Sequence, residues 1–312
     1  KVSATSQPLF FMPETLLVIA GPTASGKTSL AIRLGEYFQT EIISADSRQF
    51  FGEIPVGTAA PTSEQLKKLR HHFIGTLSIH EYYNASMFEE DALDRLKHLF
   101  KERDVVIMAG GSGMYIDAVC SGIDVLPAID PEIRNQLKEQ YRSGGIESLR
   151  MKLKLLDPVS YDRVDLRNPN RILKALEVSM QTGKPYSSFL TSTRKPRPFR
   201  ILKIGLNLPR PELYARIDRR VDEMIQNGLV EEARKLSAFR ELNALNTVGY
   251  KELFQYLDGI IDLERAIELI KRNTRRFAKR QLTWFKRDEQ IRWFHPASFE
   301  EIIRHIKVQL MR

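Results

Sequence analysis

The chain has 312 residues, more than the roughly 250 to 300 that one hydrophobic core usually supports, so we expect two lobes. Its 42% apolar and 28% charged residues exclude an intrinsically disordered protein. Lys and Arg number 48 against 39 Asp and Glu, a net charge of +9. The excess lies after residue 110, because residues 1–110 carry 11 basic and 13 acidic side chains. A polyanion is therefore a candidate partner, and solubility is the alternative reason for a basic surface.

Cys120 is the only cysteine, which excludes an intrachain disulfide and a cysteine-based metal cluster and fits a reducing, cytoplasmic compartment. The longest apolar stretch near the start, residues 9–20, is interrupted by Pro13 and Glu14 and is too short to span a membrane. It also lacks the pattern of a secretory signal, so we expect no membrane association. Because the sequence begins with Lys1 rather than Met, we expect that it either lacks its native start or begins in a tag.

Short apolar runs alternate with stretches of helical periodicity over the first 110 residues. Such runs predict buried strands of a parallel sheet, at residues 15–20, 41–45 and 104–109. The helices expected between them are residues 27–38 and 86–101. Strands that alternate with helices predict an α/β fold.

Helical patterns alone follow from about residue 131, and the expected helices are 131–141, 146–156 and 170–180. The basic, proline-containing residues 191–200 predict an extended connector. Residues 201–208 then predict a strand that rejoins the sheet, followed by further helices. We therefore expect an α/β core with C-terminal helices, residues 1–122 and 196–312, and an all-helical insertion domain, residues 123–195.

Residues 21–28, GPTASGKT, match G-x-x-x-x-G-K-[ST] at every specified position, after a predicted strand and at the start of a predicted helix. In such a phosphate loop, glycines let backbone amides face phosphate oxygens, Lys27 adds a charge and Thr28 is the expected Mg²⁺ ligand. The alternative is a glycine-rich turn without chemistry. The expected diphosphate-binding residues are Gly21, Pro22, Thr23, Ala24, Ser25, Gly26, Lys27 and Thr28.

The phosphate loop does not by itself name a reaction. Most proteins that carry it bind ATP or another nucleotide and transfer or hydrolyse the γ-phosphoryl group, with Mg²⁺ held by a carboxylate at the end of an apolar strand. The matching strand here ends in Gly110 and Gly111 without an acid. This absence disfavours routine triphosphate hydrolysis.

Asp46 follows the second predicted strand, at the sheet edge where ligands bind in open α/β folds. A carboxylate there can act as a general base or hold Mg²⁺ indirectly, and the alternative is a turn or a helix N-cap. Ser47 and Gln49 follow it and can hydrogen-bond the edge of a nucleobase.

Seven segments, taken in order, resemble the signatures of the tRNA dimethylallyltransferase family, also called tRNA isopentenyltransferases. Together they span nearly the whole chain. Any one of them except the first is a weak signal for the family, but seven in the same order are highly specific. The bacterial form is the closer match, because no Cys/His cluster follows residue 290, where eukaryotic relatives carry a zinc finger. The segments are GPTASGKT (21–28), ISADSRQ (43–49), VGTAAP (56–61), AGGSGMY (109–115), NPNRILKALEV (168–178), TVGYKE (247–252) and KRQLTWFK (279–286).

The resemblance implies the transfer of a dimethylallyl group from dimethylallyl diphosphate to N6 of the adenosine at tRNA position 37. We expect a P-loop-type core, Mg²⁺ as cofactor and a monomer. Asp46 would accept the N6 proton, and Arg216 and Arg220 would reach the diphosphate. Ser112 stands where the family usually has Thr, and its hydroxyl can make the same hydrogen bond. Arg48 stands where a smaller or apolar residue is usual, which leaves its contact with RNA open.

The chemistry of an allylic diphosphate is consistent with these roles. The carbon–oxygen bond can ionise partly before the amine attacks, so the main demand is to neutralise charge on the departing oxygens. The acceptor base must be flipped out of its stacked loop to be reached. The expected catalytic residues are Asp46, Lys27, Thr28, Arg216 and Arg220.

Residues 271–287 carry eight basic side chains and no acid. On a helix they form a broad basic face, for which we favour phosphate binding over a merely solvated surface. We expect Phe277 and Trp284, on another side, to lie in the core. The expected tRNA contacts, from this face and from the resemblance, are Asp46, Ser47, Arg48, Gln49, Ser112, Arg134, Asn170, Arg171, Lys174, Thr247, Gly249, Arg275, Arg276 and Gln281.

Three rival functions share some of these features. An adenylate isopentenyltransferase would use the phosphate loop and Asp46 but would not need the basic insertion. A small-molecule kinase would turn over ATP, which the missing acid disfavours. A non-catalytic RNA-binding protein would leave the phosphate loop without a role. His71 and His72 precede a predicted strand and resemble a metal pair, but neighbours along a strand point to opposite faces.

Overall fold

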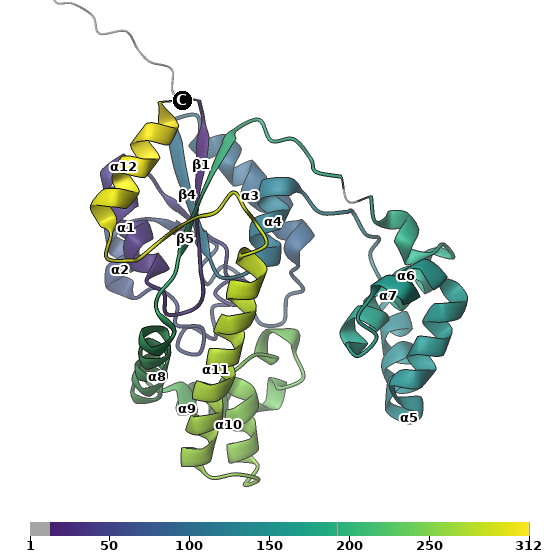
Figure 1. Cartoon of the computed structure of the whole chain (residues 1–312). Helices are drawn as coiled ribbons and strands as arrows, with labels where there is room; N and C mark the ends of the chain where they lie inside the picture. The colour runs from purple at the N-terminus through teal and green to yellow at the C-terminus, as the bar shows by residue number, and fades with distance from the viewer. Residues whose placement is uncertain (1–12, 192, 312) are drawn as a thin grey trace, which may run out of the picture. The chain divides into compact units, whose positions relative to one another are not determined.

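The structure, a computed structural model, describes residues 13–191 and 193–311. Six parallel strands form one sheet in the order β3-β2-β4-β1-β5-β6 (Figure 1). Ala20 at the end of β1 pairs with Gly110 of β4 and Gly205 of β5, so the loop after β1 leaves the middle of the sheet. The strands are β1 (Thr15–Ala20), β2 (Ile42–Ser44), β3 (His71–His72), β4 (Val105–Gly110), β5 (Arg200–Leu206) and β6 (Arg292–Phe294).

Helices cover both faces of the sheet, which confirms the predicted α/β class with a P-loop-type core. The side chains of β1 alternate between two hydrophobic layers: Leu16 and Val18 pack with α3 and α4, and Leu17 and Ile19 pack with α1 and α12. Figure 1 shows these two pairs of helices beside the sheet. The helices of this unit are α1 (Lys27–Phe38), α2 (Ser63–Lys68), α3 (Ala85–Leu99), α4 (Gly113–Ser121), α8 (Arg210–Gln226), α9 (Leu229–Lys235), α10 (Tyr250–Leu257), α11 (Leu263–Phe285) and α12 (Phe299–Leu310), with short 3₁₀ turns at Ser237–Phe239 and Asn243–Leu245.

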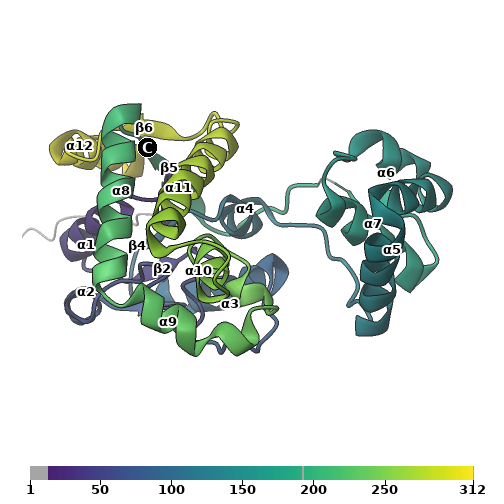
Figure 2. The same ribbon diagram turned by 90° about the horizontal axis from the view of Figure 1, so that it is seen from below.

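A third hydrophobic cluster is formed by α8, α9, α10 and the first half of α11 (Figures 1 and 2). Ile270 of α11 is buried in this cluster, whereas Phe285 at the other end of α11 is buried with α3 and α4 against the sheet. Therefore α11 connects the two clusters and passes the carboxyl ends of the strands, where the phosphate loop lies.

Every strand and helix expected before residue 110 is present, with ends shifted by two residues at most. The edge strands β3 and β6 were not predicted, because two or three residues are too few to show an alternating pattern. His71 and His72 were expected to precede a strand, and they form β3 instead.

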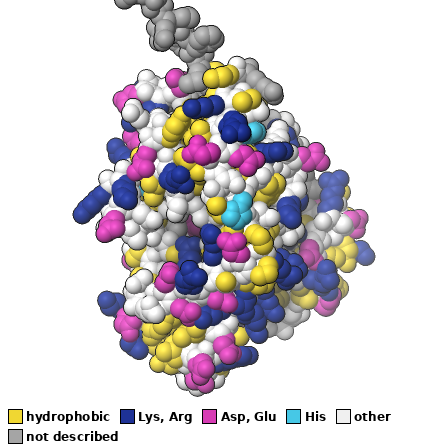
Figure 3. Space-filling view, turned by 60° about the vertical axis from the view of Figure 1, so that its left-hand side comes forward, with side chains coloured by type: hydrophobic (Ala, Val, Ile, Leu, Met, Phe, Trp, Pro, Cys, Tyr) yellow, Lys and Arg dark blue, Asp and Glu magenta, His cyan; other side chains and the backbone are white. Residues whose placement is uncertain are grey.

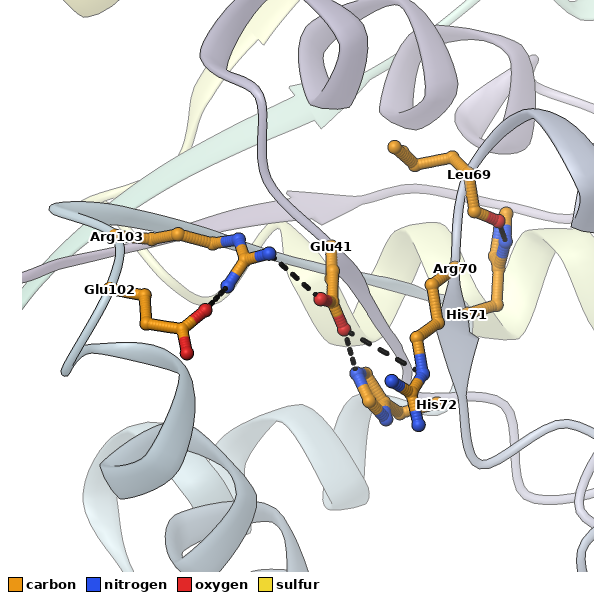
Figure 4. Close-up of polar contacts among 7 residues, drawn as sticks. All are labelled: Glu41, Leu69, Arg70, His71, His72, Glu102 and Arg103. Atoms are coloured by element: carbon orange, nitrogen blue, oxygen red, sulfur yellow. Dashed lines mark hydrogen bonds and ion pairs between the residues drawn. The ribbon is translucent and has the colours of Figure 1, made fainter.

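The two histidines of β3 have different partners on different sides of the strand (Figure 4). His71 Nδ1 donates to the carbonyl oxygen of Leu69 at 2.9 Å, and His72 Nε2 bonds Glu41 Oε2 at 2.7 Å. Glu41 also pairs with Arg103 at 3.0 Å, so its carboxylate joins β3 to the segment before β4. Burial lowers the pKa of both histidines. Because the two rings bond different partners on different sides of the strand, they are not arranged to share a metal ion.

The chain divides into two compact units, one of Lys1–Cys120 with Arg197–Arg312 and one of Ser121–Pro196. The second unit is helical, and its core holds Leu137, Leu149 and Leu176. Gly145, with φ 64° and ψ −169°, interrupts α5 between the two helices expected there. Its elements are α5 (Pro131–Leu156), α6 (Pro158–Arg163), α7 (Pro169–Thr182) and a 3₁₀ turn at Tyr186–Phe189. Within the described residues, no helix combines the length and the apolar character needed to cross a bilayer.

Candidate active site

The phosphate loop connects β1 to α1 and needs glycine at two positions. A Cβ on Gly21 would lie 2.7 Å from the carbonyl oxygen of Leu206, and Gly26 has a φ of 94°. No side chain caps the first turn of α1, which starts at Lys27, so the N–H groups there are available to an anion. The loop geometry is therefore that of a phosphate cradle.

Lys27 and Arg220 place positive charge beside this loop. Lys27 Nζ donates to the carbonyl oxygen of Pro22 at 2.7 Å. Arg220, on α8, donates to Thr23 Oγ1 at 3.3 Å and to the carbonyl oxygen of Ala59 at 3.1 Å. Burial, with the charge of Arg220, lowers the pKa of Lys27 to about 7, although Asp46 acts in the opposite direction.

Asp46 lies in the turn after β2, where its Oδ1 accepts the backbone N–H of Arg48 at 3.0 Å. The turn role considered for this residue is thus present, and Asp46 also lines the cavity described below. Ser112, before α4, accepts the N–H of Ser47 at 2.9 Å and donates to Ser47 Oγ at 3.1 Å. The two serines therefore join the ends of β2 and β4.

One cavity of about 570 Å³ lies against the phosphate loop and runs between the sheet and α8, α10 and α11. Its apolar walls include Val221, Met224 and Ile270. Most of the predicted site residues of the larger unit meet in it although they come from six separate segments. Those that line it are Thr23, Lys27, Thr28, Asp46, Ser47, Arg48, Gln49, Ser112, Arg220, Thr247, Arg276 and Gln281.

Two predicted tRNA contacts already use their amide groups within the protein. Gln281, 7% exposed, accepts the N–H of Thr23 at 2.8 Å and donates to the carbonyl oxygen of Gly111 at 2.9 Å. Gln49 donates to the carbonyl oxygens of Thr58 and Ala59 at 3.2 and 3.3 Å. These bonds shape the cavity, and they would have to break before either amide could read a base.

Arg216 and Gly249 are predicted residues that do not line the cavity. Arg216 is half-exposed, pairs with Glu212 at 2.9 Å, and lies beside the phosphate loop, since a Cβ on Gly26 would be 3.8 Å from Arg216 Nη1. Gly249 caps α10 with a φ of 103°, and its N–H bonds Glu252 at 2.8 Å.

The basic face of α11 is partly neutralised by acids of α8. Arg275 pairs with Asp218 at 2.5 Å, and Lys271 pairs with Asp222 at 2.5 Å. The uniform charge of residues 271–287 is therefore a property of the segment and not of the folded surface, where Asp218 and Asp222 lie against it. Acidic side chains also lie among basic ones over the face of the molecule that Figure 3 shows. Arg276 remains exposed at the cavity.

The two aromatic side chains expected in the core of α11 differ. Trp284 is packed against the sheet cluster, and its Nε1 donates to Asp117 at 2.9 Å, as a core residue would. The prediction for Phe277 was wrong, because its side chain is 40% exposed and lines the cavity. The seven-residue spacing puts Phe277 and Trp284 on the same side of α11. At Trp284 this side packs against the sheet cluster, whereas at Phe277 it lines the cavity.

The predicted residues of the helical unit lie on α5 and α7. Arg134 makes two bonds to Glu177, from Nε at 2.8 Å and from Nη2 at 3.2 Å. Asn170 and Arg171 are exposed in the first turn of α7, and Lys174 is half-buried one turn later.

Glu232 was missed by sequence reasoning, although it supports the cavity wall. Its carboxylate accepts the N–H groups of Val56 and Gly57 at 2.9 and 2.8 Å and the hydroxyl of Tyr250 at 2.5 Å. Only the segments VGTAAP and TVGYKE pointed to this region, and nothing in them indicated an acid in α9 as their common partner.

The sequence matches the family described as IPP transferase over residues 49–288. It is 54% identical over 297 residues to tRNA dimethylallyltransferase 1 of Bacteroides fragilis, covering 95% of this chain and 99% of that protein. It is 48% identical to tRNA dimethylallyltransferase of Cytophaga hutchinsonii, covering 96% and 99%. A crystal structure of the tRNA isopentenylpyrophosphate transferase of Bacillus halodurans matches with a TM-score of 0.70 and 34% identity, covering 96% and 97% of the two chains.

Proposed function

The chain belongs to the IPP transferase family, and from that premise we propose that it transfers a dimethylallyl group from dimethylallyl diphosphate to N6 of the adenosine at position 37 of tRNA, next to the anticodon. The observation that carries the proposal is the meeting of Lys27, Asp46 and Arg220 in one cavity beside the phosphate loop. That arrangement combines a diphosphate site with a base.

The phosphate loop binds the donor through its diphosphate. The amides at the start of α1 face the anion, and Lys27 and Arg220, which both line the cavity, supply positive charge. Arg216 can join them by exchanging its partner Glu212 for a phosphate oxygen. These groups stabilise the charge that develops on the departing oxygens, which is the largest electrostatic demand of the reaction.

The residues of the site also fit Mg²⁺. Thr28, an oxygen ligand, and Asp46 line the same cavity, and the described residues contain no cluster of three acids, histidines or cysteines that would cage a metal. Mg²⁺ usually keeps several waters and binds through one or two protein oxygens and substrate phosphates, which is the donor set available here. When bound it would supply Lewis-acid polarisation of the diphosphate.

Asp46 is the general base for the acceptor. The N6–carbon bond forms as the carbon–oxygen bond to diphosphate breaks, the diphosphate leaves with the electron pair, and the N6 proton passes to the Asp46 carboxylate. The base must leave its stack to reach the cavity. The hydrogen bond from the N–H of Arg48 fixes the carboxylate while leaving its second oxygen to the substrate.

The RNA is bound by charges outside the reacting centre. We assign phosphate contacts to Arg276, which is exposed at the cavity, and to Arg171 with Asn170 in the helical unit. Thr247, at the cavity, can contact the loop nucleotides. Arg275 is held by Asp218 and supports the helix pair instead. A monomer in the cytoplasm is the form and place that we propose for this activity.

The test is a transfer assay with labelled dimethylallyl diphosphate, Mg²⁺ and unmodified tRNA, run in parallel with AMP and with ATP. We expect label in tRNA, lost by at least two orders of magnitude in Asp46→Asn, as is typical when a general base is removed. Asp94→Asn is the matched control, because Asp94 is an exposed acid on α3 that does not line the cavity. Label in AMP alone, or ATP consumption without transfer, would reject the proposal.

A further inference from the structure

Phe277 is an exposed aromatic ring in the middle of a wall of the cavity. The α11 side chains that line the cavity follow helical spacing, with Ile270 and Gln281 buried at the two ends at 1% and 7% exposure. Phe277 lies between them and is 40% exposed. Among the described residues, no hydrophobic cluster includes it. An apolar ring in this position is available to a ligand.

The charges next to Phe277 show which ligand the ring suits. Arg276 and Arg280 line the same cavity and are exposed, and Arg280 lies 5.8 Å from the centre of the Phe277 ring. In the described part of the chain neither arginine forms an ion pair, in contrast to Arg275 one position away. An aromatic face flanked by uncompensated arginines is the usual combination for an unpaired nucleobase and its phosphates.

We infer that Phe277 provides the stacking surface for one unpaired nucleobase of the acceptor RNA, while Arg276 and Arg280 bind the adjoining phosphates. This rests on the proposed function, because it needs RNA at the cavity. Gln281 holds the phosphate loop one helical turn from Phe277, so the stacked base is either the acceptor adenine or a direct neighbour of it. In both cases the ring holds the opened loop in place while the reacting base is presented.

The inference is tested by tRNA affinity, measured without donor on an unmodified tRNA transcript. Base–aromatic stacking predicts that Phe277→Ala weakens binding by about 5- to 150-fold, that Phe277→Trp retains it, and that Phe277→Leu, an apolar side chain without a π face, loses most of it. Phe239→Ala is the matched control, since Phe239 is also 40% exposed, contacts His80 and does not line the cavity.

A second measurement identifies the base. In transcripts with one abasic nucleotide at a time around the anticodon, the effect of Phe277→Ala should vanish for one position and persist for the others. Loss at the acceptor position would identify the acceptor adenine, and loss beside it would identify a neighbour.

Three results would overturn the inference. These are full affinity in Phe277→Ala, full affinity in Phe277→Leu, and a rise in KM for dimethylallyl diphosphate with tRNA affinity unchanged, which would make the ring a wall for the donor. Thermal unfolding of each variant separates these results from a loss of fold. If the unaltered protein prenylates no tRNA, the proposed function itself has failed.

Discussion

Lys27 and Arg220 both line the cavity beside the phosphate loop, and the charge of Arg220 raises the free-energy cost of charging Lys27. Burial and this repulsion bring the pKa of Lys27 to about 7. A diphosphate bound beside them would raise the pKa of Lys27 again, because an anion favours the charged amine. The free protein therefore has a positive electrostatic potential at this site, and binding of the donor's diphosphate would favour the charged form of Lys27.

The protonation of Lys27 predicts how donor binding depends on pH. Below about pH 7 the amine of the free protein is already charged, so binding takes up no proton there. Above it the amine must be protonated on binding, and affinity for the diphosphate should fall by about tenfold per pH unit. Calorimetry in buffers of different ionisation heat should detect uptake of one proton near pH 8. The slope should vanish in Lys27→Arg, and an equal slope in that variant would show that another group titrates.

Helix α11 shows how an element acquires its function from its neighbours. Its basic residues lie in two adjacent rows, and α8 supplies Asp218 and Asp222 opposite one of them. The pairs hold the two helices together beside the cavity. Arg276, in the other row, forms no ion pair among the described residues, so its charge is available to a ligand.

The salt dependence of tRNA binding should distinguish the two rows. Arg276→Gln should reduce the slope of log K against log salt by about 1, the value for one phosphate contact. Arg275→Gln is the matched control on the next residue, and its slope should change little because Asp218 already neutralises it. Affinity for the diphosphate should stay the same in both. Equal slopes for the two variants would contradict the division of the helix into two rows.

At the scale of the whole molecule, the cavity depends on contacts between segments far apart in the sequence. Glu232 of α9 holds the loop of Val56 and Gly57 against Tyr250 of α10. The same loop gives a carbonyl oxygen to Arg220 at Ala59. One carboxylate thus links the fold of the C-terminal helices to the position of Arg220, which we propose binds the diphosphate.

Replacing this carboxylate should destabilise the protein. Glu232→Gln puts an amide donor opposite at least one existing donor, and we expect the free energy of unfolding to fall by about 1 to 3 kcal/mol. Urea denaturation measures this value. Glu231→Gln is the matched control, because the neighbouring Glu231 is exposed with a 4.0 Å ion pair, and its effect should stay within about 0.5 kcal/mol. A loss in Glu231→Gln as large as in Glu232→Gln would argue against the role of the buried carboxylate.

The sequence by itself determined the four inner strands of the sheet, the phosphate loop and the position of Asp46. Apolar runs and the GPTASGKT motif are patterns among residues that are adjacent in the sequence. They predict the structure correctly because strand burial and glycine geometry depend on neighbouring residues. The edge strands β3 and β6 were too short to leave such a pattern. The resemblance to a known family then named the reaction.

Only the tertiary structure decided which side chains are free to act. The sequence could not show that Asp218 neutralises Arg275, that Gln281 is occupied by the phosphate loop, or that Phe277 faces the cavity rather than the core. Each of these outcomes depends on a partner 50 to 260 positions away in the sequence, or on where the packed core ends along a helix. The periodicity of neighbouring residues carries no information on such contacts. The charge and burial of a residue are properties of its surroundings in the fold, and therefore they appear only once the chain has folded.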